Sequence, residues 1–202
     1  FHDTEMNYEI MADDLLHFIW QHNINKVTIL GHSMGGKVAM WFALNHSDYI
    51  DKLIIVDIAP VNYVHSFDKT INALKNLPLA ELKNRKQAEE FLASAIPELS
   101  YRQFLLQNLI LKNGAYCWRV NLDIFANNAD YIIGFPETNH ISPCMKKALF
   151  IAGEQSHYIK QGQFETLFPN AQLKIIANAA HWLHVQQPEA FILAVIQFLE
   201  QI

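Results

Sequence analysis

The segment Gly31-His32-Ser33-Met34-Gly35-Gly36 carries the strongest chemical signal in the sequence. A serine between glycines at this spacing is typical of a sharp turn from a strand into a helix, which exposes the hydroxyl as a nucleophile. The surroundings agree, because a short apolar run over 26–30 comes before the segment and a helical pattern over 36–44 follows it. We therefore predict that Ser33 is a nucleophile at a helix N-terminus; the alternative is a glycine-rich turn with a merely capping serine.

The neighbours of Ser33 have predicted tasks of their own. Side chains at Gly31 and Gly35 would collide where strand and helix pack closest. The backbone N–H of Met34 is predicted to be one donor of an oxyanion hole. His32 is expected to be a packing residue of the turn rather than a base.

A serine hydroxyl needs a base, and His181 is the best placed of the ten histidines. It follows the last predicted strand, in a loop that small residues allow to pass close to the sheet. The alternative for His181 is a helix-capping role. His184 lies one turn further on and is expected to be structural.

The acid that orients the base is predicted to be Asp57. The more usual place is the loop after the penultimate strand, but Ser156 occupies that position and carries no charge. Asp57 ends an apolar strand at the carboxyl edge of the predicted sheet, where a buried charge requires a partner. Glu154 and Glu137 are the second and third candidates, and a turn former ahead of Pro60 is the structural alternative.

The elements that hold these residues alternate between strands and helices. A helical pattern starts at Tyr8 with Asn7 as its cap, and a final helix starts at Pro188. The final helix is expected to place its apolar residues on one stripe, formed by Phe191, Ile192, Val195, Phe198, Leu199 and Ile202. The predicted strands are 26–30, 52–56, 148–153 and 172–176, the first two expected to be buried on both faces, and a further helix is expected over 158–167. This order predicts a mostly parallel sheet covered by helices.

The stretch 61–140 lacks strand signals and is predicted to be a helical insertion. Its expected helices are 67–77, 85–95, 101–111 and 122–126.

Composition narrows the possible functions. The chain has 202 residues, 51% hydrophobic and 17% charged, with a net charge of -5. A nucleic-acid surface would need an excess of cations, and a membrane span would need about 20 consecutive apolar residues. Neither is present, so we expect no nucleic-acid partner and no membrane segment. Cys117 and Cys144 are expected to be free thiols in a reducing cytoplasm, and no metal or cofactor motif is found.

These motifs together resemble the α/β-hydrolase superfamily. More narrowly, the chain is similar to a bacterial esterase and acyl-CoA thioesterase group whose catalytic Asp follows the strand after the nucleophile. The resemblance implies a hydrolase core over 1–60 and 141–202 and a cap or lid over 61–140, where 118–122 is similar to a cap motif of the group. It also implies the roles of nucleophile, acid and base for Ser33, Asp57 and His181.

The chain departs from the family pattern in two ways. Family members carry about four more strands before this point, including a loop that supplies the second oxyanion-hole donor. We therefore expect the N-terminal strands to be absent here and that donor to lie upstream of Phe1. Ala180 and Gln186 replace a glycine and an acid that are common in the family, and neither is expected to touch the chemistry.

The predicted function is a serine hydrolase that cleaves carboxylic esters or acyl thioesters, acyl-CoA among them, through an acyl-enzyme. A carbon–carbon bond hydrolase or a peptidase of the same fold is an alternative, because it would use the same triad. A non-catalytic binding module is another.

Overall fold

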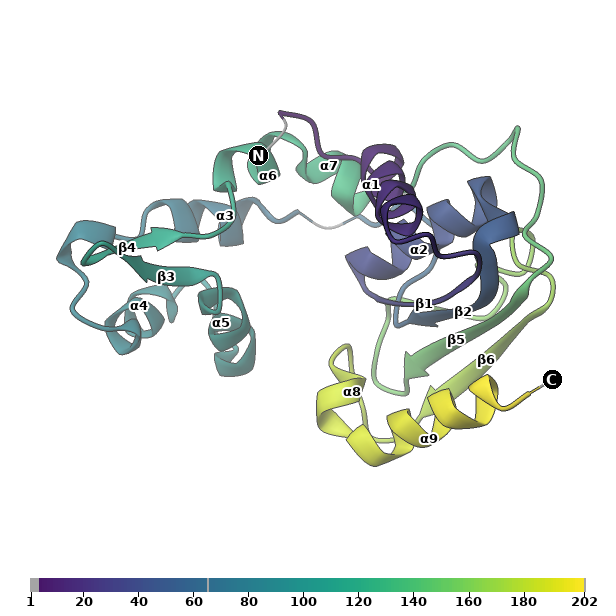
Figure 1. The fold of residues 1–202 in the computed structure, drawn as a ribbon. Helices are drawn as coiled ribbons and strands as arrows, with labels where there is room; N and C mark the ends of the chain where they lie inside the picture. Colours follow the sequence, from purple (N-terminus) through teal and green to yellow (C-terminus); the bar gives the residue numbers. More distant parts are fainter. Residues whose placement is uncertain (1–3, 65, 202) are drawn as a thin grey trace. The chain divides into compact units, whose positions relative to one another are not determined.

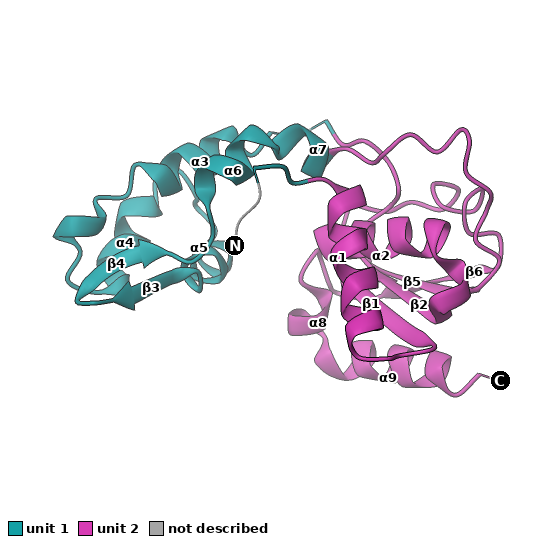
Figure 2. Cartoon of the chain, turned by 45° about the horizontal axis from the view of Figure 1, so that its top comes forward, with its two compact units in different colours: residues 1–6, 64–133 teal, residues 7–63, 134–202 magenta. Residues whose placement is uncertain are grey.

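The computed structural model describes residues 4–64 and 66–201, which form two compact units. Unit 1 comprises residues 1–6 and 64–133, and unit 2 comprises residues 7–63 and 134–202 (Figure 2). Ser33, Asp57 and His181 all belong to unit 2.

Unit 2 is built on a parallel sheet in the order β1-β2-β5-β6 (Figure 1). The strands are β1 Val27–His32, β2 Ile50–Val56, β5 Lys147–Gly153 and β6 Ala171–Ile176. Strands β2 and β5 pair directly, from Lys52 opposite Lys147 to Val56 opposite Ile151. The long stretch between them therefore joins two neighbouring strands, and the predicted α/β architecture is confirmed.

Helices cover both faces of this sheet (Figure 1). Helices α1 (Tyr8–Gln21) and α2 (Met34–Asn45) lie on one face, and α8 (Leu183–Gln186) and α9 (Pro188–Leu199) lie on the other. The short 3-10 helix η1 (Ser47–Tyr49) leads into β2. As predicted, Asn7 caps α1, accepting a hydrogen bond from the Ile10 N–H.

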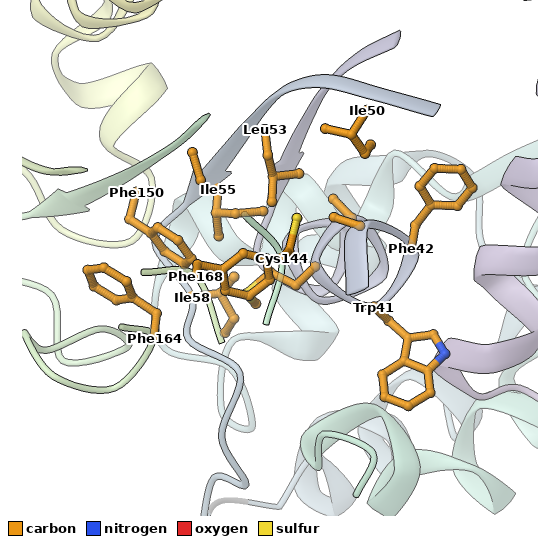
Figure 3. Close-up of a cluster of buried hydrophobic side chains, with 14 of the residues drawn as sticks. Trp41, Phe42, Ile50, Leu53, Ile55, Ile58, Cys144, Phe150, Phe164 and Phe168 are labelled. Carbon is orange, nitrogen blue, oxygen red and sulfur yellow. The ribbon is translucent and has the colours of Figure 1, made fainter. Parts of the chain in front are cut away.

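The central strands are buried on both faces, as their apolar runs predict. In β2, Leu53 and Ile55 join the core beneath α1 and α2, while Ile54 and Val56 join the core beneath α8 and α9. Figure 3 shows the first of these cores, where the ring of Phe150 stacks on Phe164 at 4.0 Å.

Three sequence predictions for unit 2 are wrong. Strand β1 exposes Thr28 and Leu30, because it lies at the edge of the sheet that the described residues form. The expected helix over 158–167 is a series of turns, and Gly162 there has φ +89°. The apolar stripe expected along α9 is wrong at Ile192 and Leu199, which are exposed. Its other described members, Phe191, Val195 and Phe198, pack on the core, and Ile202 lies outside the described residues.

Unit 1 has its own small core, formed by buried residues such as Leu74, Leu92, Leu106 and Leu109. Its elements are α3 Asp68–Lys75, η2 Leu79–Glu81, α4 Arg85–Leu92, α5 Leu99–Leu106, β3 Leu109–Lys112, β4 Ala115–Trp118, α6 Leu122–Asn127 and α7 Ala129–Ile133.

The prediction that this insertion is purely helical is wrong. Strands β3 and β4 form an antiparallel hairpin, and the helix expected over 101–111 ends at Leu106. The turn residues Asn113 and Gly114 have φ 52° and 80°, as the favoured two-residue hairpin turn requires.

Within residues 4–64 and 66–201, none of the helices has the length and apolar character that crossing a membrane requires.

Candidate active site

Ser33 sits at the turn between β1 and α2, as the sequence predicts. Its backbone has φ 53° and ψ -122°, a conformation that is strained for any residue other than glycine. The Ser33 N–H donates to the Val56 carbonyl at 3.0 Å, and the Ser33 carbonyl accepts from the Gly36 N–H at 2.8 Å. The turn is thus held from the neighbouring strand and from the helix that follows.

The glycines around Ser33 have different roles. A Cβ at Gly31 would lie 2.3 Å from the Gly35 carbonyl oxygen, so the predicted collision there is confirmed. A Cβ at Gly35 would meet no atom within 4 Å, so the same prediction for Gly35 is wrong. The second crowded position is Gly36 instead, where a Cβ would lie 2.5 Å from Ile58.

Three side chains that are far apart in the sequence form one hydrogen-bonded chain. The Ser33 Oγ lies 3.0 Å from His181 Nε2, and His181 Nδ1 lies 2.8 Å from Asp57 Oδ2. Because a carboxylate only accepts hydrogen bonds, Nδ1 carries the imidazole proton. Nε2 is then free to accept the hydroxyl proton of Ser33.

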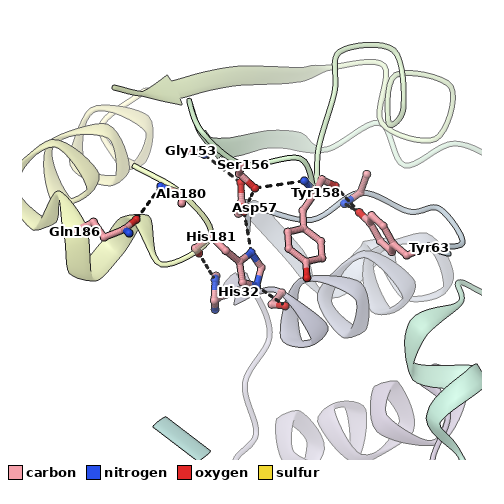
Figure 4. A network of polar contacts seen from close by, with 11 residues as sticks. His32, Asp57, Tyr63, Gly153, Ser156, Tyr158, Ala180, His181 and Gln186 are labelled. Carbon is pink, nitrogen blue, oxygen red and sulfur yellow. Dashed lines mark hydrogen bonds and ion pairs between the residues drawn. The ribbon is translucent and has the colours of Figure 1, made fainter. Parts of the chain in front are cut away.

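Asp57 is fully buried and follows β2 with φ 53°. Besides His181, its carboxylate accepts from the Gly153 N–H at 3.0 Å and from the Ser156 hydroxyl (Figure 4). Three donors therefore compensate a charge that has lost its water.

The other acid candidates bond elsewhere. Glu154 Oε2 accepts from the Asn178 N–H at 2.9 Å, and Glu137 Oε2 accepts from the Asn139 amide at 3.1 Å. Ser156, which sequence reasoning set aside as uncharged, instead binds the carboxylate of Asp57. The position of Ser156 three residues after Gly153, where the acid more usually lies, is the sequence signal that points to this contact.

Three residues determine how the loop that carries His181 is placed. Gly153 lets it pass, since a Cβ there would lie 2.4 Å from the Ala180 carbonyl oxygen. Gln186 Oε1 accepts from the Ala180 N–H at 2.7 Å, so Gln186 fixes the residue before the imidazole (Figure 4). The Tyr158 ring packs on the imidazole, with centroids 4.2 Å apart. Sequence reasoning missed all three contacts.

His32 also acts on this loop. Its Nε2 donates to the His181 carbonyl oxygen at 2.9 Å (Figure 4), and its ring lies 4.7 Å from the rings of both His181 and His184. Burial lowers the pKa of His32 to about 4, and the neighbouring His181 and His184 act in the same direction. The hydrogen bond to the carbonyl and the charge of Asp57 oppose this shift more weakly. His32 is therefore neutral near pH 7, with its proton on Nε2.

Met34 is the first residue of α2, so its N–H is one of the amides that a helix leaves without an internal partner. The positive end of the helix dipole lies there too, beside the Ser33 hydroxyl. Across the described part of the chain, no group of three or more His, Cys, Asp or Glu is arranged to hold a metal ion.

Comparison with known proteins identifies the family of this chain. The sequence model of the family described as alpha/beta hydrolase fold matches residues 2–188. The chain belongs to the α/β-hydrolase family.

Among its relatives, the sn-1-specific diacylglycerol lipase ABHD11 of Danio rerio is 38% identical over 98% of this chain. This chain spans 65% of the length of that lipase. Esterase YbfF of Escherichia coli is 35% identical over 98% of this chain and 76% of its own length. A solved marine microorganism esterase is 41% identical, with a TM-score of 0.92 over 98% of this chain and 79% of its own.

The pKa of His32 leads to a pH-dependent prediction. As the pH falls from about 6.5 to about 4, an unfolded chain takes up a proton that the folded His32 excludes, so stability falls. His32→Gln removes this effect and keeps an amide that can reach the His181 carbonyl. As the pH falls across this range, we expect the melting temperature of the wild type, measured by circular dichroism, to drop more than that of the variant. Parallel curves would contradict the lowered pKa.

Proposed function

We propose that the chain is a serine hydrolase that cleaves carboxylic esters or acyl thioesters through an acyl-enzyme on Ser33. The observation that supports this most is the continuous hydrogen-bonded chain from Ser33 Oγ through His181 to Asp57. The esterase and lipase names of the relatives support esters as the substrate class.

The proposed reaction has two halves. His181 Nε2 takes the Ser33 proton while Oγ attacks the acyl carbonyl carbon. The oxyanion that forms accepts a hydrogen bond from the Met34 N–H, at the positive end of α2. His181 then gives the proton to the departing alcohol or thiol. A water molecule, activated by the same imidazole, hydrolyses the acyl-enzyme and frees Ser33.

Asp57 keeps His181 ready for both halves. Its carboxylate holds the proton on Nδ1 and stabilises the imidazolium that forms during each transfer. Because Gly153 and Ser156 also bind the carboxylate, it has little freedom to turn away from the ring. The buried negative charge is therefore fixed where positive charge develops.

We further propose that the insertion, expected over 61–140 and compact over 64–133, is a cap that selects the acyl group. In support, the insertion follows Asp57 and the carboxyl end of β2, and it is far longer than a crossover between adjacent strands needs.

A cytoplasmic location is also proposed, supported by the free thiols of Cys117 and Cys144.

The nucleophile can be tested by covalent labelling. A fluorophosphonate is expected to label the wild type at Ser33, and Ser33→Ala is expected to abolish both labelling and hydrolysis of nitrophenyl esters and acyl-CoAs. Labelling that persists in Ser33→Ala would place the nucleophile elsewhere. An unlabelled wild type that turns over neither substrate would favour the non-catalytic alternative.

The acid can be tested with a matched pair of amide variants. Asp57→Asn is expected to lower kcat by roughly 10³-fold to 10⁴-fold, because an amide no longer holds the required tautomer. Glu154→Gln keeps an acceptor for the Asn178 N–H and is expected to remain within about threefold of the wild type. The reverse ranking would reject Asp57 as the acid.

A further inference from the structure

Lys37 is buried within unit 2, with 1% exposure, although lysine is rarely found fully inside a protein. It lies in the first turn of α2, four residues after Ser33. Its backbone N–H donates to the Ser33 carbonyl oxygen at 3.2 Å. Lys37 is therefore joined through the main chain to the turn that holds the proposed nucleophile.

The ammonium of Lys37 reaches two distant parts of the chain. Nζ donates to the Gly134 carbonyl oxygen at 2.6 Å and to the Val61 carbonyl oxygen at 3.1 Å. Unit 2 runs to Tyr63 and resumes at Gly134, so these carbonyls lie where the chain leaves for unit 1 and where it returns (Figure 2). We call residues 60–63 the outgoing passage and residues 134–137 the returning passage.

A second contact joins the passages to each other. The Phe135 N–H donates to Asn62 Oδ1 at 2.7 Å. The Phe135 ring also packs on Tyr8 and Trp41, with centroids 6.1 Å and 6.0 Å apart. The returning passage is thus held by the outgoing passage, by α1 and by α2.

Burial at this position disfavours the charged form of the Lys37 side chain. Burial lowers the pKa of Lys37 to about 7. Two titratable side chains that face it are Tyr8 and Tyr63, whose rings lie 5.7 Å and 4.6 Å from Nζ and attract a cation. Burial raises the pKa of both phenols, so they stay neutral. A methionine would fill similar space without this desolvation, whereas the ammonium adds hydrogen bonds to both passages.

We propose that Lys37, assisted by Asn62, is a positioning residue that fastens both passages to the first turn of α2 and thereby limits the motion of residues 64–133. Because the passages and Ser33 then share one anchoring turn, the tether also influences which acyl groups are accepted. This second statement rests on the proposed function.

The tether itself can be tested without substrate, by hydrogen exchange of the full chain followed by mass spectrometry. Lys37→Met is expected to speed exchange in both passages by at least about tenfold, because the bonds from the ammonium are lost. Exchange in β2, at the centre of the sheet, is expected to stay unchanged. If a folded Lys37→Met protein exchanges in both passages at the same rate as the wild type, the proposal is overturned.

Asn62 supplies a matched pair should Lys37→Met fail to fold. Its side chain is exposed, so substitution leaves the core intact. Asn62→Leu removes the acceptor for the Phe135 N–H and is expected to speed exchange in the returning passage, whereas Asn62→Asp keeps an acceptor and is expected to match the wild type. Equal exchange in the two variants would overturn the tether.

Selectivity is measured as the ratio of kcat/KM for a nitrophenyl octanoate to that for a nitrophenyl acetate. Lys37→Met is expected to change this ratio by more than about threefold while fluorophosphonate labelling of Ser33 persists. Faster exchange with an unchanged ratio would overturn the role in selectivity. A wild type that hydrolyses neither ester would instead refute the proposed function, and the exchange result would still decide the tether.

Discussion

The constraint on which the site depends is the burial of the Asp57 carboxylate. A charge removed from water must be compensated, and here the compensation comes from Gly153, Ser156 and His181. These donors come from the end of β5, the loop after it and the loop after β6. The need to surround one carboxylate therefore brings three segments to the same edge of the sheet, and the imidazole is placed as part of that arrangement.

Backbone strain at two positions complements this electrostatic constraint. Ser33 and Asp57 follow neighbouring parallel strands, and both have φ 53°. Each is pinned by a main-chain bond to the next strand, Ser33 to Val56 and Asp57 to Ile151. Strained conformations of this kind persist where surrounding structure fixes them. The parallel sheet supplies that rigidity, and side chains from both turns meet at His181.

The sequence predicted what depends on local pattern and on strand order. The motif around Ser33, the apolar strands and the order of Ser33, Asp57 and His181 were sufficient to bring these residues together. Prediction from the sequence failed where contacts between distant residues determine the local structure. The helical pattern over 101–111 predicts a helix up to Leu111, whereas β3 and β4 pair across the turn Asn113-Gly114. Ser156 carries no charge, and nothing local in the sequence shows that its hydroxyl faces a buried carboxylate. The sequence predicts crowding at Gly35 rather than at Gly36, because the crowding at Gly36 comes from the distant Ile58.

The most direct test of the account is the protonation of His181, observed by ¹⁵N NMR of histidine-labelled protein with the signal assigned by its loss in His181→Gln. In the neutral imidazole we predict a proton on Nδ1 and none on Nε2, and in Asp57→Asn we predict that this preference is lost. A neutral wild-type imidazole with its proton on Nε2, or a tautomer that Asp57→Asn leaves unchanged, would contradict the claim that the buried carboxylate organises the site.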